Sequence, residues 1–116
     1  MPKTVLVIDD ELLILDALSV VLRDMGQTVV TCSDPVAAAD IAEKGNYDLI
    51  VCDLRMPGKN GAEVTEEILR RNPSARVLIA TAFPGDPLAA RALSAGALGL
   101  LKKPFEIFKI IEYLEG

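Results

Sequence analysis

Carboxylates follow directly on two apolar segments of the sequence. The stretch VLVIDDE, residues 5–11, ends in Asp9, Asp10 and Glu11, and the segment DLIVC is followed at once by Asp53. Adjacent acidic groups repel one another, and the repulsion grows where water is scarce. An oxygen-rich, histidine-free cluster suits a hard divalent cation. Mg²⁺ is the natural candidate, because it keeps several waters and takes few carboxylates from the protein.

Two other polar residues follow apolar segments in the same way. Thr81 comes after RVLIA, and Lys103 comes after LGLLK. In an open parallel sheet, ligands bind at the carboxyl ends of the strands, so we expect both side chains beside the carboxylates. A carboxylate next to a cation can attack phosphorus and give an acyl phosphate. Lys103 would pair with one phosphoryl oxygen, and Thr81 could donate a hydrogen bond to another.

Each of these residues alone has an ordinary structural explanation. Asp9 or Asp10 could cap the first helix, and Asp53 could be a turn residue. Thr81 is a common strand-end residue, and Lys103 could be a solvated surface lysine. Only the combination of all of them at one end of one sheet favours a phosphoryl-transfer site.

The elements that would position these residues alternate regularly along the chain. Apolar, β-branched segments that predict strands occupy residues 4–8, 28–32, 48–52, 76–80 and 98–102. Three of them are near-continuous hydrophobic blocks, which is typical of strands buried on both faces of a parallel sheet. Segments with helical spacing lie between them and after the last. The pattern predicts a (βα)5 α/β fold, a doubly wound parallel sheet with helices on both faces.

Local signals predict where the helices begin and end. The second helix is expected to begin with Asp34 as N-cap and Pro35 at its first position, and a later Asp-Pro pair predicts another start. The last helix is expected within residues 105–116. In the first helix, we expect Leu12 opposite the core, flanked by Leu15 and Val20, as a patch for a partner. The core stripe of that helix is predicted to contain Ile14, Ala17, Leu18, Val21, Leu22 and Met25.

Composition limits the classes of function. The 116 residues fit a single domain over residues 1–116, and 51% of them are hydrophobic, which argues against disorder. The net charge of −5 argues against direct nucleic-acid binding by this domain, which needs clustered basic residues. Neither a signal peptide nor a membrane-length apolar segment is seen, so a soluble, cytoplasmic protein without membrane contact is expected.

Taken together, the motifs resemble the receiver domain of two-component response regulators. The resemblance rests on VLVIDDE, DLIVCDLRMPGKNG, RVLIATAF and GALGLLKKPF, in family order and spacing over nearly the whole chain. It implies the flavodoxin-like strand order 2-1-3-4-5. It also implies a phosphoacceptor domain that assists its own phosphorylation and dephosphorylation but is not an enzyme.

The resemblance implies a role for individual residues. Asp53 matches the phosphoacceptor, Asp10 the direct Mg²⁺ ligand, and Asp9 a neighbour that reaches the metal through water. Arg55 would lend its backbone carbonyl to the metal, and Mn²⁺ could replace Mg²⁺.

Further matches concern the phosphoryl group itself. Thr81 matches the switch hydroxyl, and Lys103 matches the lysine that pairs with the phosphoryl group. Ala82 is small and leaves room for donors, and the bond before Pro104 is expected to be cis. The partner would be a sensor histidine kinase or a histidine phosphotransfer protein. Phosphorylation would switch the surface of the fourth helix, fifth strand and fifth helix, which could also form a homodimer.

The sequence departs from the family at one switch position. Leu100 stands where the family usually carries an aromatic residue, so signalling could differ, although simple packing of Leu100 is preferred. Phe83 and Arg55 flank the path of the attacking water and could shield an acyl phosphate or swing into solvent.

Three other classes of function share some of these features. The alternative is a pseudo-receiver, an interaction module that works without phosphorylation. A haloacid-dehalogenase-like phosphatase would need a second Asp two residues after its nucleophile. A nucleotide-binding flavodoxin-like domain would need a phosphate loop where this chain has acids.

Overall fold

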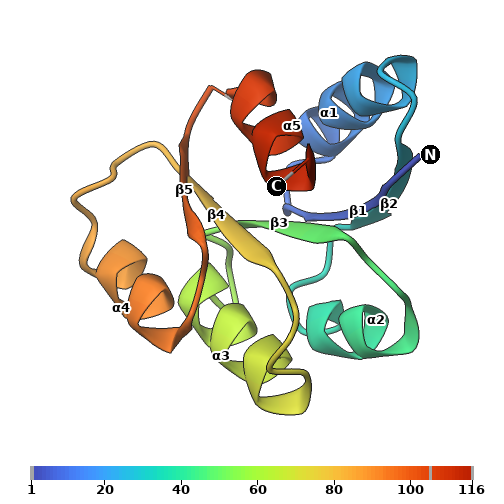
Figure 1. Ribbon diagram of the computed structural model, residues 1–116. Helices are drawn as coiled ribbons and strands as arrows, with labels where there is room; N and C mark the ends of the chain where they lie inside the picture. The colour runs from blue at the N-terminus through green and yellow to red at the C-terminus, as the bar shows by residue number, and fades with distance from the viewer. Residues whose placement is uncertain (1, 105, 116) are drawn as a thin grey trace.

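In the described part of the chain, residues 2–104 and 106–115 of a computed structural model, five parallel strands form the sheet (Figure 1). Their order is β2-β1-β3-β4-β5, as the family resemblance implied. The strands are β1 (Thr4–Ile8), β2 (Thr28–Cys32), β3 (Leu49–Asp53), β4 (Val77–Thr81) and β5 (Gly99–Lys102). The predicted strands agree with these bounds to within one residue at either end.

Helices cover both faces of the sheet. They are α1 (Leu12–Asp24), α2 (Ala38–Lys44), α3 (Gly61–Arg71), α4 (Pro87–Ala95) and α5 (Ile107–Glu115). Helices α1 and α5 lie on one face, and α2, α3 and α4 lie on the other (Figure 1). A hydrophobic core lies on each face of the sheet, and alternate side chains of β1 point into one or the other. Val5 and Val7 pack with α1 and α5, whereas Leu6 and Ile8 pack on the opposite side. Both faces are therefore buried, which explains the near-continuous apolar strands.

Local sequence signals set the ends of α3 and α4. The Asn60 side chain accepts a hydrogen bond from the Glu63 amide, and the Glu63 carboxylate accepts one from the Asn60 amide, which is a capping box. Asp86 caps α4 by accepting from the Leu88 amide at 2.9 Å. Gly96 ends α4 with a φ of +117°, a left-handed conformation that glycine adopts without strain. The Asp-Pro start predicted for this helix is confirmed.

The predicted start of α2 is wrong. Asp34 does not cap the helix, which begins at Ala38. Instead, the Asp34 carbonyl accepts from the Ala37 amide, three residues on, and its side chain accepts from the Val36 amide. These bonds form a tight turn that satisfies the local amides before the α-helix starts.

The predicted core face of α1 is also wrong in part. The buried residues are Leu15, Leu18, Ser19 and Leu22. Three residues of the predicted stripe are exposed: Ala17, and Val21 and Met25 at 41% each. Leu15, predicted beside the solvent patch, is buried. Leu12 and Val20 are exposed as predicted. Because α1 is apolar on nearly every side, periodicity alone does not select the stripe that packs.

The end of the chain follows the expectation where it is described. The peptide bond between Lys103 and Pro104 is cis, as predicted. Helix α5 occupies Ile107–Glu115, and the flanking positions Phe105 and Gly116 of the predicted helix lie outside the described residues. Among the described helices, none has the length and apolar character needed to cross a membrane.

Candidate functional site

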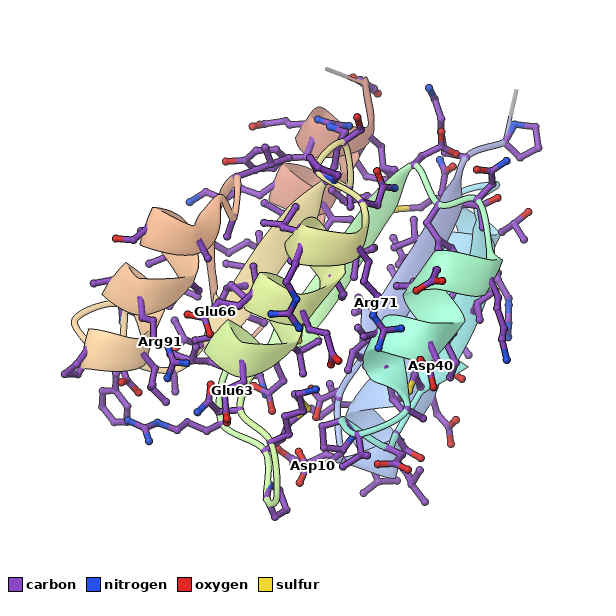
Figure 2. The ribbon with its side chains drawn as sticks, turned by 90° about the horizontal axis from the view of Figure 1, so that it is seen from below. Asp10, Asp40, Glu63, Glu66, Arg71 and Arg91 are labelled. Carbon is purple, nitrogen blue, oxygen red and sulfur yellow. The ribbon has the colours of Figure 1, made fainter. Side chains whose placement is uncertain are left out.

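The carboxyl ends of β1 and β3 bring three carboxylates together. The two strands are neighbours, with Ile8 paired to Cys52, so the residues that follow them lie side by side. Asp9, Asp10 and Asp53 each offer one oxygen, and these oxygens lie within 4.8 Å of one another. We call these three residues the acidic cluster. Asp9 and Asp53 are buried, and Asp10 is half-buried at the end of the sheet next to the loop that enters α3 (Figure 2).

Lys103 reaches the acidic cluster from the loop after β5. Its Nζ lies 2.9 Å from Asp53 Oδ1, 3.3 Å from Asp9 Oδ2 and 4.0 Å from Glu11 Oε1. Strand β4 separates β5 from β3, so the long lysine side chain spans the end of a neighbouring strand. Asp9 is also fixed locally, because its Oδ1 accepts from the Glu11 amide at 3.0 Å. Asp9 thus has a local structural contact in addition to its place in the cluster.

The charges of the site are unbalanced. Burial raises the pKa of Asp53 to about 6, the hydrogen bond from Lys103 opposes this, and the negative charge of Asp9 adds to it. Burial alone would lower the pKa of Lys103, but Asp53 and Asp9 raise it, so its ammonium stays charged at neutral pH. One ammonium faces three carboxylates. A hard divalent cation fits these oxygen donors and this surplus of negative charge.

Thr81 is the last residue of β4, and its hydroxyl is hydrogen-bonded to the backbone of Phe83. The side chain is buried, its Oγ1 donates to the Phe83 carbonyl at 3.2 Å and accepts from the Phe83 amide at 3.1 Å. The sequence placed Thr81 at this edge but did not reveal the turn with Phe83. Ala82, next in the chain, is exposed beside the site.

A hollow of about 270 Å³ opens beside Asp53. Its lining contains Glu11, Asp53, Leu54, Arg55, Thr81, Ala82, Phe83, Asp86 and Lys103. Asp86 belongs to the later Asp-Pro pair, from which the sequence predicts only a helix start and not a place at this opening. The signal was present, because an Asp-Pro pair soon after a strand puts a carboxylate at the same edge of the sheet.

The two expected shielding residues take different positions. The Phe83 side chain is directed largely into solvent, with the residue 75% exposed. The Arg55 guanidinium crosses the opening to Asp86, with Nε 2.8 Å from Oδ2 and Nη2 2.7 Å from Oδ1. The structure therefore gives no support to shielding by the Phe83 ring, and it joins Arg55 to the start of α4.

Leu100 lies on β5 opposite Ile79 and packs against the core beneath α2, α3 and α4. This packing agrees with the preferred interpretation of the missing aromatic residue.

The backbone of Gly61 approaches the site closely. A Cβ at this position would meet the Asp53 carbonyl oxygen and would lie 2.8 Å from Leu54 Cα. A glycine here lets α3 start directly against the β3 end.

Comparisons with known proteins agree with this arrangement. A family model described as "Response regulator receiver domain" matches residues 5–115. The transcriptional regulatory protein PdtaR of Mycobacterium tuberculosis is 36% identical over 115 residues, which cover 98% of this chain and 56% of that protein. The transcriptional regulatory protein ZraR of Klebsiella oxytoca is 36% identical over 106 residues, covering 91% of this chain and 24% of that protein. The chain thus spans between about a quarter and about half of the length of these relatives.

Solved structures show the same fold. The chemotaxis protein CheY4 of Vibrio cholerae superposes with a TM-score of 0.87 at 27% identity, covering 99% of this chain and 98% of that one. The receiver domain of a sensor histidine kinase from Pseudomonas aeruginosa has a TM-score of 0.88 at 26% identity, covering 99% and 96%, and its structure has a magnesium ion coordinated in the active-site cleft. From the family match, the fold and the acidic cluster at its sheet edge, we conclude that this chain belongs to the response regulator receiver domains of two-component signalling.

Proposed function

We propose that this domain accepts a phosphoryl group on Asp53 from a phosphohistidine of a sensor histidine kinase or a histidine phosphotransfer protein. One observation carries the proposal. The Asp53 carboxylate, only 5% exposed, lies beside Lys103 and the rest of the acidic cluster, and it lines the hollow through which a donor would approach.

A divalent cation held by the acidic cluster and the Arg55 carbonyl, Mg²⁺ or Mn²⁺, would neutralise charge on the phosphoryl oxygens. The donor set fits, because three carboxylate oxygens already converge there. Lys103 would then exchange part of its contact with Asp53 for a phosphoryl oxygen. Its raised pKa keeps the ammonium charged for this role.

In the transfer, an Asp53 carboxylate oxygen bonds to phosphorus while the bond from phosphorus to the imidazole nitrogen breaks. The electron pair of that bond stays on the imidazole. Thr81 would turn its hydroxyl from the Phe83 carbonyl to a phosphoryl oxygen, which frees the loop between β4 and α4. This movement would bias an existing equilibrium of the α4-β5-α5 surface.

The domain is proposed to act as a phosphoacceptor and not as an enzyme with a separate substrate. Hydrolysis of the acyl phosphate would return it to the starting state. The α4-β5-α5 surface is the proposed site of partner binding and of a homodimer. Its exposed apolar residues include Leu93 and Leu98, at 41% and 42% exposure.

The mass of the intact protein tests this function. After incubation with Mg²⁺ and acetyl phosphate, the wild-type chain should gain the mass of one phosphoryl group. Asp53→Ala and a sample with a metal chelator should gain none. Phosphorylation of Asp53→Ala to the wild-type extent would show that the acceptor is a different residue.

A pseudo-receiver that signals without phosphorylation is the second candidate. The aliphatic Leu100 favours it, because it cannot make the hydrogen bond of the phenol often found at that position. Absence of any mass gain in the folded protein, with both donor and Mg²⁺ present, would favour this candidate over phosphotransfer.

A further inference from the structure

We propose that Arg55 is a second phosphoryl-binding residue of this site and that Asp86 holds it back through an ion pair. The inference rests on the proposed function, because it concerns the same phosphoryl group on Asp53. It assigns to the Arg55 side chain a role separate from that of its backbone carbonyl.

The position of Arg55 makes the contact feasible. The residue follows Asp53 by two positions, and both line the same hollow. Its side chain is 66% exposed, so packing does not fix it. Asp86, on the far side of the opening, holds the guanidinium by two hydrogen bonds of 2.8 and 2.7 Å. A rotation of the arginine side chain would exchange this partner for an oxygen bound to Asp53.

The charges at the opening favour movement of the Arg55 guanidinium toward a phosphoryl group. Among the residues that line the hollow, the carboxylates of Glu11, Asp53 and Asp86 repel an incoming phosphoryl group. Lys103 lies inside, 18% exposed, and is paired with Asp53 and Asp9. Arg55 is the more exposed of the two lining cations, and its planar fork matches phosphate oxygens in pairs.

The ion pair is suited to exchange. The guanidinium of this ion pair is 66% exposed, so water solvates it readily when it leaves Asp86, whose own side chain is 9% exposed. A phosphoryl group carries close to two negative charges, against one for Asp86, so it attracts the guanidinium more strongly. Asp86 therefore acts as a competitor that lowers the rate with an anionic donor. Addition of the phosphoryl group would release Asp86 at the start of α4.

A substitution at Asp86 can remove the charge without removing the helix cap. Its Oδ1 also accepts from the Leu88 amide, and asparagine caps helices as well as aspartate does. A matched control pair joins helices α3 and α4. Glu66 of α3 and Arg91 of α4 form a second two-bond ion pair, at 2.8 and 2.6 Å, away from the residues that line the hollow (Figure 2).

The experiment measures the rate of phosphorylation by acetyl phosphate and Mg²⁺ from the mass of the intact protein. An Asp53 oxygen bonds to phosphorus as the bond from phosphorus to the acetate oxygen breaks, and acetate leaves with the electron pair. Asp86→Asn should react about three- to tenfold faster than wild type, and Arg55→Gln at least about threefold slower. In the double variant the gain from Asp86→Asn should disappear. Glu66→Gln should react at the wild-type rate.

The double variant separates this mechanism from a simple change in net charge. If Asp86→Asn accelerates the reaction equally with and without Arg55, repulsion by Asp86 explains the gain and the proposal is wrong. Equal rates for all variants in a protein that is phosphorylated also refute it, while the proposed function stands. If the wild type gains no phosphoryl group, both fail.

A spectroscopic readout checks the contact without a rate. In ¹⁵N-labelled protein, the Nε–H resonance of Arg55 should move when Asp53 is phosphorylated. The same resonance in the unphosphorylated protein should respond to Asp86→Asn and not to Glu66→Gln. An Arg55 signal that is unchanged on phosphorylation would contradict the proposal.

Discussion

Without a divalent cation, Asp53 should destabilise its own fold at neutral pH. Burial, opposed by Lys103 and reinforced by Asp9, raises the pKa of Asp53 from its ordinary value of 3.8 to about 6. Between these two values the folded protein retains a proton that the unfolded chain has released. Stability must therefore fall as pH rises through this window, and the loss is complete above about pH 6.

The size of the effect follows from the same numbers. A change in pKa from 3.8 to about 6 corresponds to about 3 kcal/mol of unfolding free energy. Asn resembles the protonated carboxyl group in shape and lacks its charge. Asp53→Asn should therefore raise the unfolding free energy of the metal-free protein by up to about 3 kcal/mol at neutral pH, and by almost nothing at about pH 4.

Urea unfolding with a metal chelator, followed by circular dichroism at several pH values, measures this difference. The difference between wild type and Asp53→Asn at each pH removes the contribution of other titrating groups that the substitution does not affect. Addition of Mg²⁺ should shrink the gap, because a cation that binds the folded wild type stabilises it by mass action. The reasoning would be refuted if the variant were no more stable than wild type at neutral pH without metal, or if the gap did not depend on pH.

Three further substitutions probe the site. Lys103→Met leaves two buried carboxylates without their ammonium, so the unfolding free energy in chelator should fall by about 3 kcal/mol. The loss should be smaller in Mg²⁺, and an unchanged urea midpoint would contradict this prediction. Gly61→Ala puts a Cβ against the Asp53 carbonyl, so it should lower the melting temperature and slow phosphorylation, whereas Gly85→Ala, with no atom within 4 Å, should do neither. Phe83→Ala removes a ring that faces solvent, so stability should change by less than about 0.5 kcal/mol and the decay of the phosphorylated form, followed by mass, should stay at the wild-type rate. If the phosphorylated form of Phe83→Ala decayed several-fold faster than that of wild type, the Phe83 ring would be shown to shield the acyl phosphate.

The sequence was sufficient for the fold and for the contents of the acidic cluster because both depend on order along the chain. Strands and helices alternate, and the main residues of the predicted site are each the last residue of a strand or follow one directly. In a parallel sheet those positions meet at one edge, so the sequence alone places Asp9, Asp53, Thr81 and Lys103 together.

What the sequence could not supply depends on the orientation of side chains and whole helices. Helix α1 is apolar on several sides, so Leu15 was placed toward solvent although it packs in the core. The pairing of Arg55 with Asp86 joins two loops 31 residues apart, and no spacing rule links them. The turn between Thr81 and Phe83 likewise depends on the rotation of one hydroxyl.

These unforeseen contacts meet in one short segment, residues 83–86. The Phe83 carbonyl accepts from both the Thr81 hydroxyl and the Asp86 amide, and the Asp86 carboxylate holds Arg55. Thr81 and Arg55 approach this segment from two different strand ends. If both turn toward a phosphoryl group on Asp53, the segment loses one hydrogen bond to its carbonyl and one ion pair at its cap in the same event. The start of α4 would then respond to phosphorylation even though Leu100 cannot serve as an aromatic switch, because neither contact passes through that side chain.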